Sequence, residues 1–214
     1  MTFMNRLLTT DKLICAFDTG LRTLFAKPHS ERAHPDAGLE EPLLNEQEKK
    51  HVSALMRINH TGEVCAQALY SGQALTAKNA ATSITMQQAA REETEHLAWC
   101  ESRIEALGGH TSVLNPLFYA GSFAIGAAAG ALGDKWSLGF LEETEKQVGA
   151  HLASHLDQLP IADEKSRKII EQMQTDEAKH ANDAKQQGAA ALPLPVKFCM
   201  KKMSELMTST TYHI

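Results

Sequence analysis

Residues 86–107, MQQAAREETEHLAWCESRIEAL, show the pattern that the rest of this chain repeats. Apolar side chains recur at the spacing of an amphipathic helix, from Met86 through Leu97 to Ile104. The same helix face carries Glu93 and His96, which are one turn apart. We therefore predict a helix that presents a carboxylate and an imidazole to an apolar interior.

Three further stretches have the same periodicity, so we expect four long helices. They cover about residues 45–78, 83–107, 136–159 and 163–187, and Asp163 is the expected N-cap of the last. Each helix has one glutamate near the middle of its apolar face, and these are Glu63, Glu93, Glu145 and Glu177.

The lengths of the connections predict how the four helices are arranged. Short links join the first helix to the second and the third to the fourth, whereas residues 108–135 separate the second from the third. Two hairpins joined by one long crossover are typical of an all-α, ferritin-like four-helix bundle. We divide the chain into an amphipathic N-terminal helix with a polar linker, residues 1–42, and a bundle domain, residues 43–214.

Composition disfavours some classes of function and favours others. Hydrophobic residues make up 43% of the chain, as in globular proteins, and a net charge of −5 with 6% aromatic residues argues against a nucleic-acid partner. The four cysteines are far apart in sequence, which favours a reducing compartment over a disulfide framework. Ten histidines and 26 acidic residues make carboxylate–imidazole metal chemistry the first hypothesis to test.

The tetrapeptide Glu-x-x-His places two metal ligands on one helix face, and it occurs four times in this chain. The four copies are Glu31–His34, Glu48–His51, Glu93–His96 and Glu177–His180. The first copy lies in the linker and the second at the start of a helix, so we expect both to be surface pairs. The other two lie in the middle of apolar stripes, where a ligand would face the core.

Each of these two copies follows a lone glutamate on the neighbouring helix. Glu63 lies 30 residues before Glu93, and Glu145 lies 32 residues before Glu177, so each hairpin returns the chain to the same height. Four buried glutamates without counter-cations would cost much free energy, which favours bound metal. We predict two facing half-sites of a di-iron or dimanganese centre, with the ligands Glu63, Glu93, His96, Glu145, Glu177 and His180.

Metal-bound histidines usually donate their second N–H to a carboxylate. Glu92 and Asp176 each precede a ligand by one residue, so we expect Glu92 to support His180 and Asp176 to support His96. His151 and Asn59 are weaker candidates for the same supporting role. No catalytic residue beyond the metal site, and no site for an organic cofactor, is predicted.

Three other segments are amphipathic or apolar. Residues 1–27 have one apolar face, including Phe3, Leu7 and Leu8, and we expect a retained helix that packs on the domain or contacts a membrane or another subunit. The run at 117–133 is rich in Ala and Gly and suits a packed helix, an interfacial contact or a membrane span. Residues 196–207 mix apolar residues with lysines. We predict peripheral attachment to the cytoplasmic side of the cell membrane.

Four sequence runs around these positions resemble the demethoxyubiquinone hydroxylase family, the di-iron monooxygenases of ubiquinone biosynthesis. They are RINHTGE (57–63), EETEH (92–96), ETEKQVGAH (143–151) and DEAKH (176–180). The resemblance covers about residues 45–214, and the six predicted ligands stand at the family's ligand positions. One departure is Leu152 after His151, where eukaryotic members usually have an aromatic residue.

The resemblance implies hydroxylation of the ring of a polyprenylated 3-methyl-6-methoxy-1,4-benzoquinol with O₂, at two Fe ions per chain. It also implies a separate reductant, either NADH or a redox protein, and leaves a homo-oligomer open.

Three other functions would use a similar bundle. The first is a ferritin-like iron-storage or peroxide-handling protein. The second is a ribonucleotide reductase radical subunit, which needs a tyrosine near the metals; Cys100 stands seven residues after Glu93, and Tyr70 seven residues after Glu63. The third is a purely structural bundle, which the buried glutamates disfavour.

Overall fold

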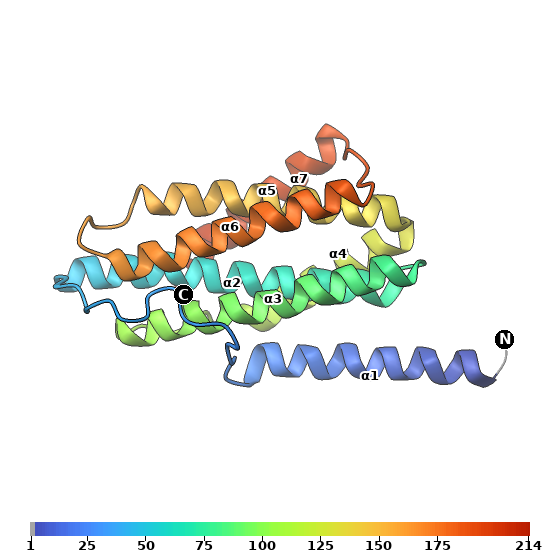
Figure 1. The fold of residues 1–214 in the computed structure, drawn as a ribbon, viewed down its shortest axis with the longest axis horizontal. Helices are drawn as coiled ribbons and strands as arrows, with labels where there is room; N and C mark the ends of the chain where they lie inside the picture. Colours follow the sequence, from blue (N-terminus) through green and yellow to red (C-terminus); the bar gives the residue numbers. More distant parts are fainter. Residues whose placement is uncertain (1–2) are drawn as a thin grey trace.

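The computed structural model describes residues 3–214, with side chains described from residue 10 onward, and this part of the chain is helical with connecting loops (Figure 1). The helices are α1 (Phe3–Phe25), α2 (Glu46–Thr76), α3 (Ala80–Ala106), α4 (Asn115–Leu132), α5 (Asp134–Leu156), α6 (Glu164–Gln186) and α7 (Leu194–Thr211). The hairpins α2–α3 and α5–α6 form a four-helix bundle, and α4 is the crossover between them. The predicted all-α, ferritin-like architecture is confirmed. The side chains of Phe3, Leu7 and Leu8 lie outside the described residues.

Local chemistry fixes where the bundle helices begin and end. Asn45 accepts hydrogen bonds from the first-turn amides of α2, and the Glu48 carboxylate accepts one from the Asn45 amide, which completes a capping box. Asp163 caps α6 as predicted, because its side chain accepts from the Ser166 amide at 3.1 Å. Gly108 and Gly188 follow α3 and α6 with φ of 75° and 94°, a conformation that stops a helix.

The bundle core has an apolar layer on each side of a polar layer. One layer contains Leu55 and Trp99, and the other contains Met86 and Leu141. In α2 the layer of Leu55 precedes Glu63 in sequence and the other layer follows it. In α3, which runs in the opposite direction, the layer of Met86 precedes Glu93 and the other layer follows it. The fold therefore places those glutamates at mid-height in the bundle, between two water-excluding layers.

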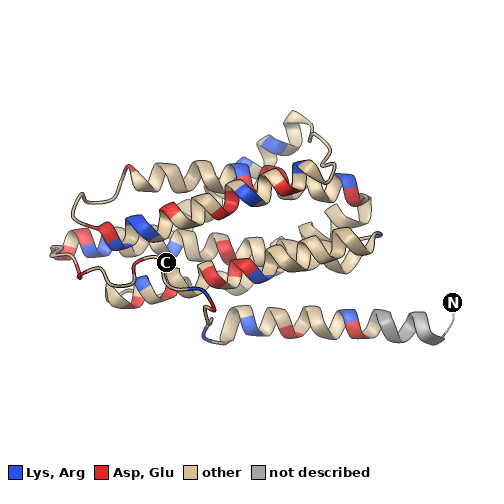
Figure 2. Cartoon of the chain, in the orientation of Figure 1, with Lys and Arg blue, Asp and Glu red and all other residues tan. Residues whose placement is uncertain are grey.

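The crossover helix α4 packs along α2, and at several glycines the two backbones meet without an intervening side chain. A Cβ atom at Gly126 would overlap the Leu69 carbonyl, and one at Gly72 would overlap the Phe123 carbonyl. Figure 2 shows α4 without charged residues along its length. A packed crossover helix is thus what the structure shows. Within residues 3–214, no helix is long and apolar enough to cross a bilayer.

The helices outside the bundle contact it through few residues. In α1, Thr23 donates a hydrogen bond to Gln67, and Leu24 packs against an apolar cluster that includes Tyr119. Ile14 and Phe17 are exposed. Helix α7 contacts α2 and α5. The segment between α1 and α2, residues 26–45, has no helix or strand and runs across the bundle surface (Figure 1).

Candidate metal centre

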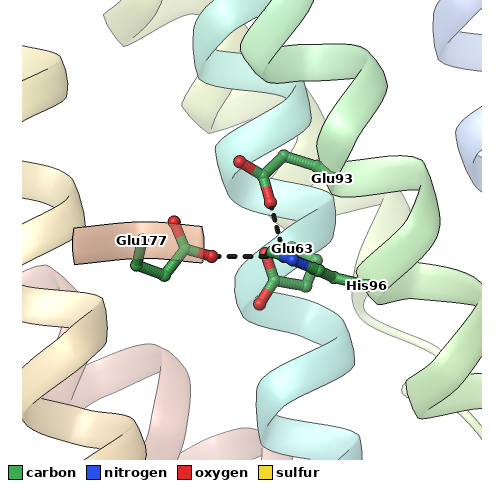
Figure 3. A group of neighbouring side chains, drawn as sticks. All are labelled: Glu63, Glu93, His96 and Glu177. Atoms are coloured by element: carbon green, nitrogen blue, oxygen red, sulfur yellow. Dashed lines mark hydrogen bonds and ion pairs between the residues drawn. The ribbon is translucent and has the colours of Figure 1, made fainter. Parts of the chain in front are cut away.

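All six predicted ligands are buried and meet between α2, α3, α5 and α6. Their oxygen and nitrogen atoms form two overlapping groups, and within each group the potential ligand atoms lie within 4.8 Å of one another. The first group is Glu63, Glu93, His96 and Glu177, shown in Figure 3, and the second is Glu93, Glu145, Glu177 and His180. The six side chains that the sequence spacing predicts to be neighbours therefore lie together in the folded chain.

Glu93 and Glu177 belong to both groups, and this defines the geometry of the centre. A carboxylate has two oxygens, so each of these residues can contact two ions at once. Glu63 with His96 then lies at one end of the cluster, and Glu145 with His180 at the other. The arrangement suits two neighbouring cations that share two bridging carboxylates.

Both imidazoles direct Nδ1 into the cluster. His96 Nδ1 lies 3.0 Å from Glu93 Oε2 and 3.2 Å from Glu177 Oε1 (Figure 3). His180 Nδ1 lies 3.4 Å from Glu177 and 3.5 Å from Glu145. The second nitrogen of each ring points away, toward a different carboxylate.

The ionisable groups of this cluster shift one another's pKa values. Burial raises the pKa of Glu63 and Glu145, and repulsion from the neighbouring glutamates raises it further. Burial alone would lower the pKa of the histidines, but facing carboxylates raise it, for His180 to about 12. The carboxylates and imidazoles are therefore competing for protons in a dry interior.

Several buried atoms of the cluster have no hydrogen-bond partner, and a metal would supply one. They are Glu93 Oε1, Glu145 Oε2, both carboxylate oxygens of Glu177, and His180 Nδ1. Orphaned polar atoms of this kind are costly and rare in folded proteins. Four carboxylates would balance the charge of two divalent cations, and the donor set suits iron or manganese. The residues present therefore fit a dimetal centre.

The two supporting carboxylates lie where sequence reasoning expected them. His96 Nε2 is 3.1 Å from Asp176 Oδ2, and His180 Nε2 is 2.5 Å from Glu92 Oε2. Each pair links α3 to α6 across the bundle. This contact fixes the ring orientation that leaves Nδ1 facing the cluster.

The weaker candidates lie elsewhere. Asn59 Oδ1 is 2.8 Å from His155 Nδ1, and the His151 and His155 rings are 4.1 Å apart. Among the described residues, neither Asn59 nor His151 hydrogen-bonds any of the six cluster residues. His155 is a buried histidine of the core.

The two other Glu-x-x-His copies do not join the cluster. Glu48 caps α2, and His51 Nδ1 is 2.9 Å from the Tyr212 hydroxyl. Glu31 is exposed in the segment before α2, and His34 lies 3.8 Å from Asp36.

One contact with the cluster was missed from the sequence. The Tyr70 hydroxyl, fully buried, donates a hydrogen bond to Glu145 Oε1 at 2.5 Å. From the sequence alone, Tyr70 is expected only as a radical site or a core residue. The available signal was its position seven residues after Glu63, which places it on the same face of α2.

Two facing Glu and Glu-x-x-His half-sites in a bundle with one long crossover define a ferritin-like protein with a candidate carboxylate-bridged dimetal centre. Comparison with known proteins specifies the family. The chain belongs to the family described as ubiquinone biosynthesis protein COQ7, which it matches over residues 50–211. The resemblance noted in the sequence is thereby confirmed.

Similar proteins match along nearly their whole length. The chain is 59% identical over 204 residues to the 3-demethoxyubiquinol 3-hydroxylase of Chromobacterium violaceum, an alignment that covers 95% of this chain and 99% of that protein. It is 60% identical over 204 residues to the protein of the same name from Laribacter hongkongensis, with the same coverage. For the Nitrosomonas eutropha protein, also of that name, identity is 58% over 208 residues, covering 97% of this chain and 100% of the relative.

Proposed function

We propose that this chain hydroxylates the ring of a polyprenylated 3-methyl-6-methoxy-1,4-benzoquinol with O₂ in ubiquinone biosynthesis. The observation that carries the proposal is the buried cluster of four glutamates and two histidines with orphaned atoms directed inward. The family and the hydroxylase names of the relatives support the same substrate class.

The six cluster residues would hold two Fe ions per chain. Bound ferrous ions supply the electrons with which O₂ is activated. In the overall reaction one oxygen atom enters a ring C–H bond and the other leaves as water, which consumes two electrons and two protons from outside the ring. Glu93 and Glu177 would hold the two ions together, and the apolar layers above and below exclude water from the centre.

A polyprenyl tail confines the substrate to lipid, and the surface of the chain suits that source. Apolar side chains are exposed on α1, α4 and α7, among them Phe17, Leu117 and Phe198. Lys197, Lys201 and Lys202 lie on α7 and would favour anionic headgroups. We infer that these helices attach the bundle peripherally to the cytoplasmic side of the membrane.

The test is the fate of the oxygen atoms. Purified chain loaded with Fe(II) and supplied with a reductant and a short-tailed quinol should incorporate one atom from ¹⁸O₂ into the product, as read by mass spectrometry. Glu177→Ala is the matched inactive variant, since it removes a carboxylate shared by both groups. Oxidation and storage of iron without labelled quinol would instead support the ferritin-like alternative.

A further inference from the structure

The segment between α1 and α2 is fixed to α3 beside the metal centre. The buried carboxylate of Glu95 accepts hydrogen bonds from the Ser30 hydroxyl and from the Glu31 and Arg32 amides, the last two at 3.0 and 3.2 Å. Trp99 Nε1 donates to the Ser30 hydroxyl at 3.1 Å. These contacts hold residues 30–32 against the helix that carries Glu93 and His96.

From this position Arg32 reaches across to α6. Its Nη1 lies 2.7 Å from Asp176 Oδ2 and its Nη2 lies 3.3 Å from Oδ1, a two-pronged contact with one carboxylate. The guanidinium carbon also lies 4.8 Å from the centre of the Trp99 ring. The same Asp176 Oδ2 is 3.1 Å from His96 Nε2. A continuous chain of contacts therefore runs from Arg32 through Asp176 to His96, whose Nδ1 faces the cluster.

The opposite end of the centre has no matching contact among the described residues. Glu92, the carboxylate behind His180, accepts a hydrogen bond from Gln88, and Lys179 Nζ lies 3.8 Å from it. The Lys179 side chain is 60% exposed and presents a single nitrogen. An exposed ion pair of this kind holds its partner weakly. The two ends share Glu93 and Glu177 and differ in what lies behind their histidines, and at the second end the Glu145 carboxylate also accepts a hydrogen bond from Tyr70.

We propose that Arg32 is a positioning residue that orients Asp176 and, through it, His96, and thereby makes the Glu63–His96 end of the centre the tighter metal site. The inference rests on the proposed dimetal function. The charges of Arg32 and Asp176 offset each other, so the effect on the metal comes through the fixed orientation of the imidazole. Lysine cannot supply the planar two-pronged contact, so the geometry requires arginine.

The experiment is an anaerobic calorimetric titration of the metal-free full chain with Fe(II). We expect two unequal binding steps in the wild type. Arg32→Ala should weaken the tighter step by at least about threefold and by less than the roughly 10–100-fold typical of losing a direct partner such as Asp176. Arg32→Lys should recover little of this loss, and Lys179→Ala, the matched control behind the other half-site, should change neither step.

A spectroscopic measurement separates positioning from a general structural effect. With one equivalent of ⁵⁷Fe per chain, wild-type protein should show one dominant Mössbauer doublet, and Arg32→Ala should show two. Adding Arg32→Ala to Asp176→Asn should weaken binding no further than Asp176→Asn alone, because Arg32 acts through that carboxylate. The Arg32 side chain is 41% exposed, so the variant should fold, as circular dichroism would verify.

The outcomes that overturn the proposal are distinct from a failure of the metal centre itself. Wild-type chain that binds fewer than two Fe(II) ions contradicts both the dimetal centre and the role of Arg32. Wild-type chain that binds two ions, with both steps unchanged or equally weakened in Arg32→Ala, contradicts only the role of Arg32. Additive losses in the double variant would likewise exclude action through Asp176.

Discussion

At the scale of single residues, the four Glu-x-x-His copies provide an internal control for metal binding. We expect His96→Ala and His180→Ala each to lower iron affinity by at least roughly 10–100-fold, because each removes an imidazole Nδ1 from the cluster. His34→Ala and His51→Ala should keep iron and hydroxylation near wild type. Iron per chain after anaerobic loading, with circular dichroism to verify folding, is the measurement.

The opposite result would be informative. Loss of iron in His51→Ala, together with retention in His96→Ala, would show that the ligand assignment and the helix register behind it are wrong. Loss in all four variants would point to unfolding, which the dichroism spectra would reveal.

The six cluster residues could be predicted because they lie on regular helices, where spacing alone determines which side chains share a face. The contacts of Arg32 could not be predicted. Its segment has no periodicity, and its partner Asp176 lies 144 positions away in the sequence. The Tyr70–Glu145 hydrogen bond depends on how the two hairpins face each other, which periodicity within one helix does not specify.

At the scale of helices, the contact between α2 and α4 should tolerate no side chain at Gly126. Gly126→Ala should destabilise the chain by about 1–3 kcal/mol, because the new Cβ overlaps the Leu69 carbonyl and the backbones must separate. Gly121→Ala is the matched control on the same helix. Its Cβ would meet nothing within 4 Å, so higher helix propensity should leave stability unchanged or raised by up to about 1 kcal/mol.

Chemical denaturation monitored by circular dichroism would compare the two variants. Equal stability of Gly126→Ala and Gly121→Ala would contradict the close packing of α4 on α2.

Helices α2, α6 and α4 show what the sequence can and cannot determine about a helix. The limits of α2 and α6 follow from local signals, such as the capping box at Asn45 and the cap at Asp163. The placement of α4 does not, since a run rich in Ala and Gly favours a packed helix but is also compatible with an interfacial contact or a membrane span. Its position depends on glycines of another helix, such as Gly72, which a local pattern does not identify.

At the scale of the whole molecule, the buried ionisable groups predict that folding stability passes through a maximum as pH changes, and that bound metal alters this pH dependence. The raised pKa values of Glu63, Glu145 and His180 mean that the folded metal-free chain holds protons that the unfolded chain releases. The stability from these groups is present at low pH and declines as pH rises, for His180 above about 6.5. Burial lowers the pKa of His60 to about 4 and of His155 to about 3, so their contribution declines as pH falls below about 6.5.

Metal should remove the decline on the high-pH side of this maximum. Bound Mn(II) replaces the protons of the cluster, so it should remove the decline at high pH. It does not contact His60 or His155, so the decline at low pH should remain. Urea midpoints measured across pH, with Mn(II) and with a chelator, test this; metal-free stability that rises from about pH 7 to pH 9 would contradict it.

The exposed face of α1 should contribute to membrane attachment. Phe17, 69% exposed, would enter the interfacial region, so Phe17→Asp should lower the vesicle-bound fraction several-fold. Ile161→Asp is the control. This residue is 91% exposed and lies in the turn between α5 and α6, a turn at the end of the bundle away from α1 (Figure 1).

Flotation with anionic liposomes, followed by a high-salt wash, measures both variants. Equal binding of Phe17→Asp and wild type would exclude this face of α1 from the contact. Bound protein that resists the wash and mild detergent would contradict peripheral attachment.

The glycine contact between α2 and α4 also fixes the distance between these two helices. At Gly72 and Gly126 the two backbones meet without an intervening side chain, so there is little room for the helix that carries Glu63 to shift relative to the uncharged crossover helix. On the proposed membrane contact, α4 would rest on lipid, and the depth of the metal centre relative to the bilayer surface would then be set by the fold. A quinol anchored by its tail then meets the centre at one height. Tail length should change how strongly the quinol partitions into the membrane, and leave unchanged where its ring comes to rest.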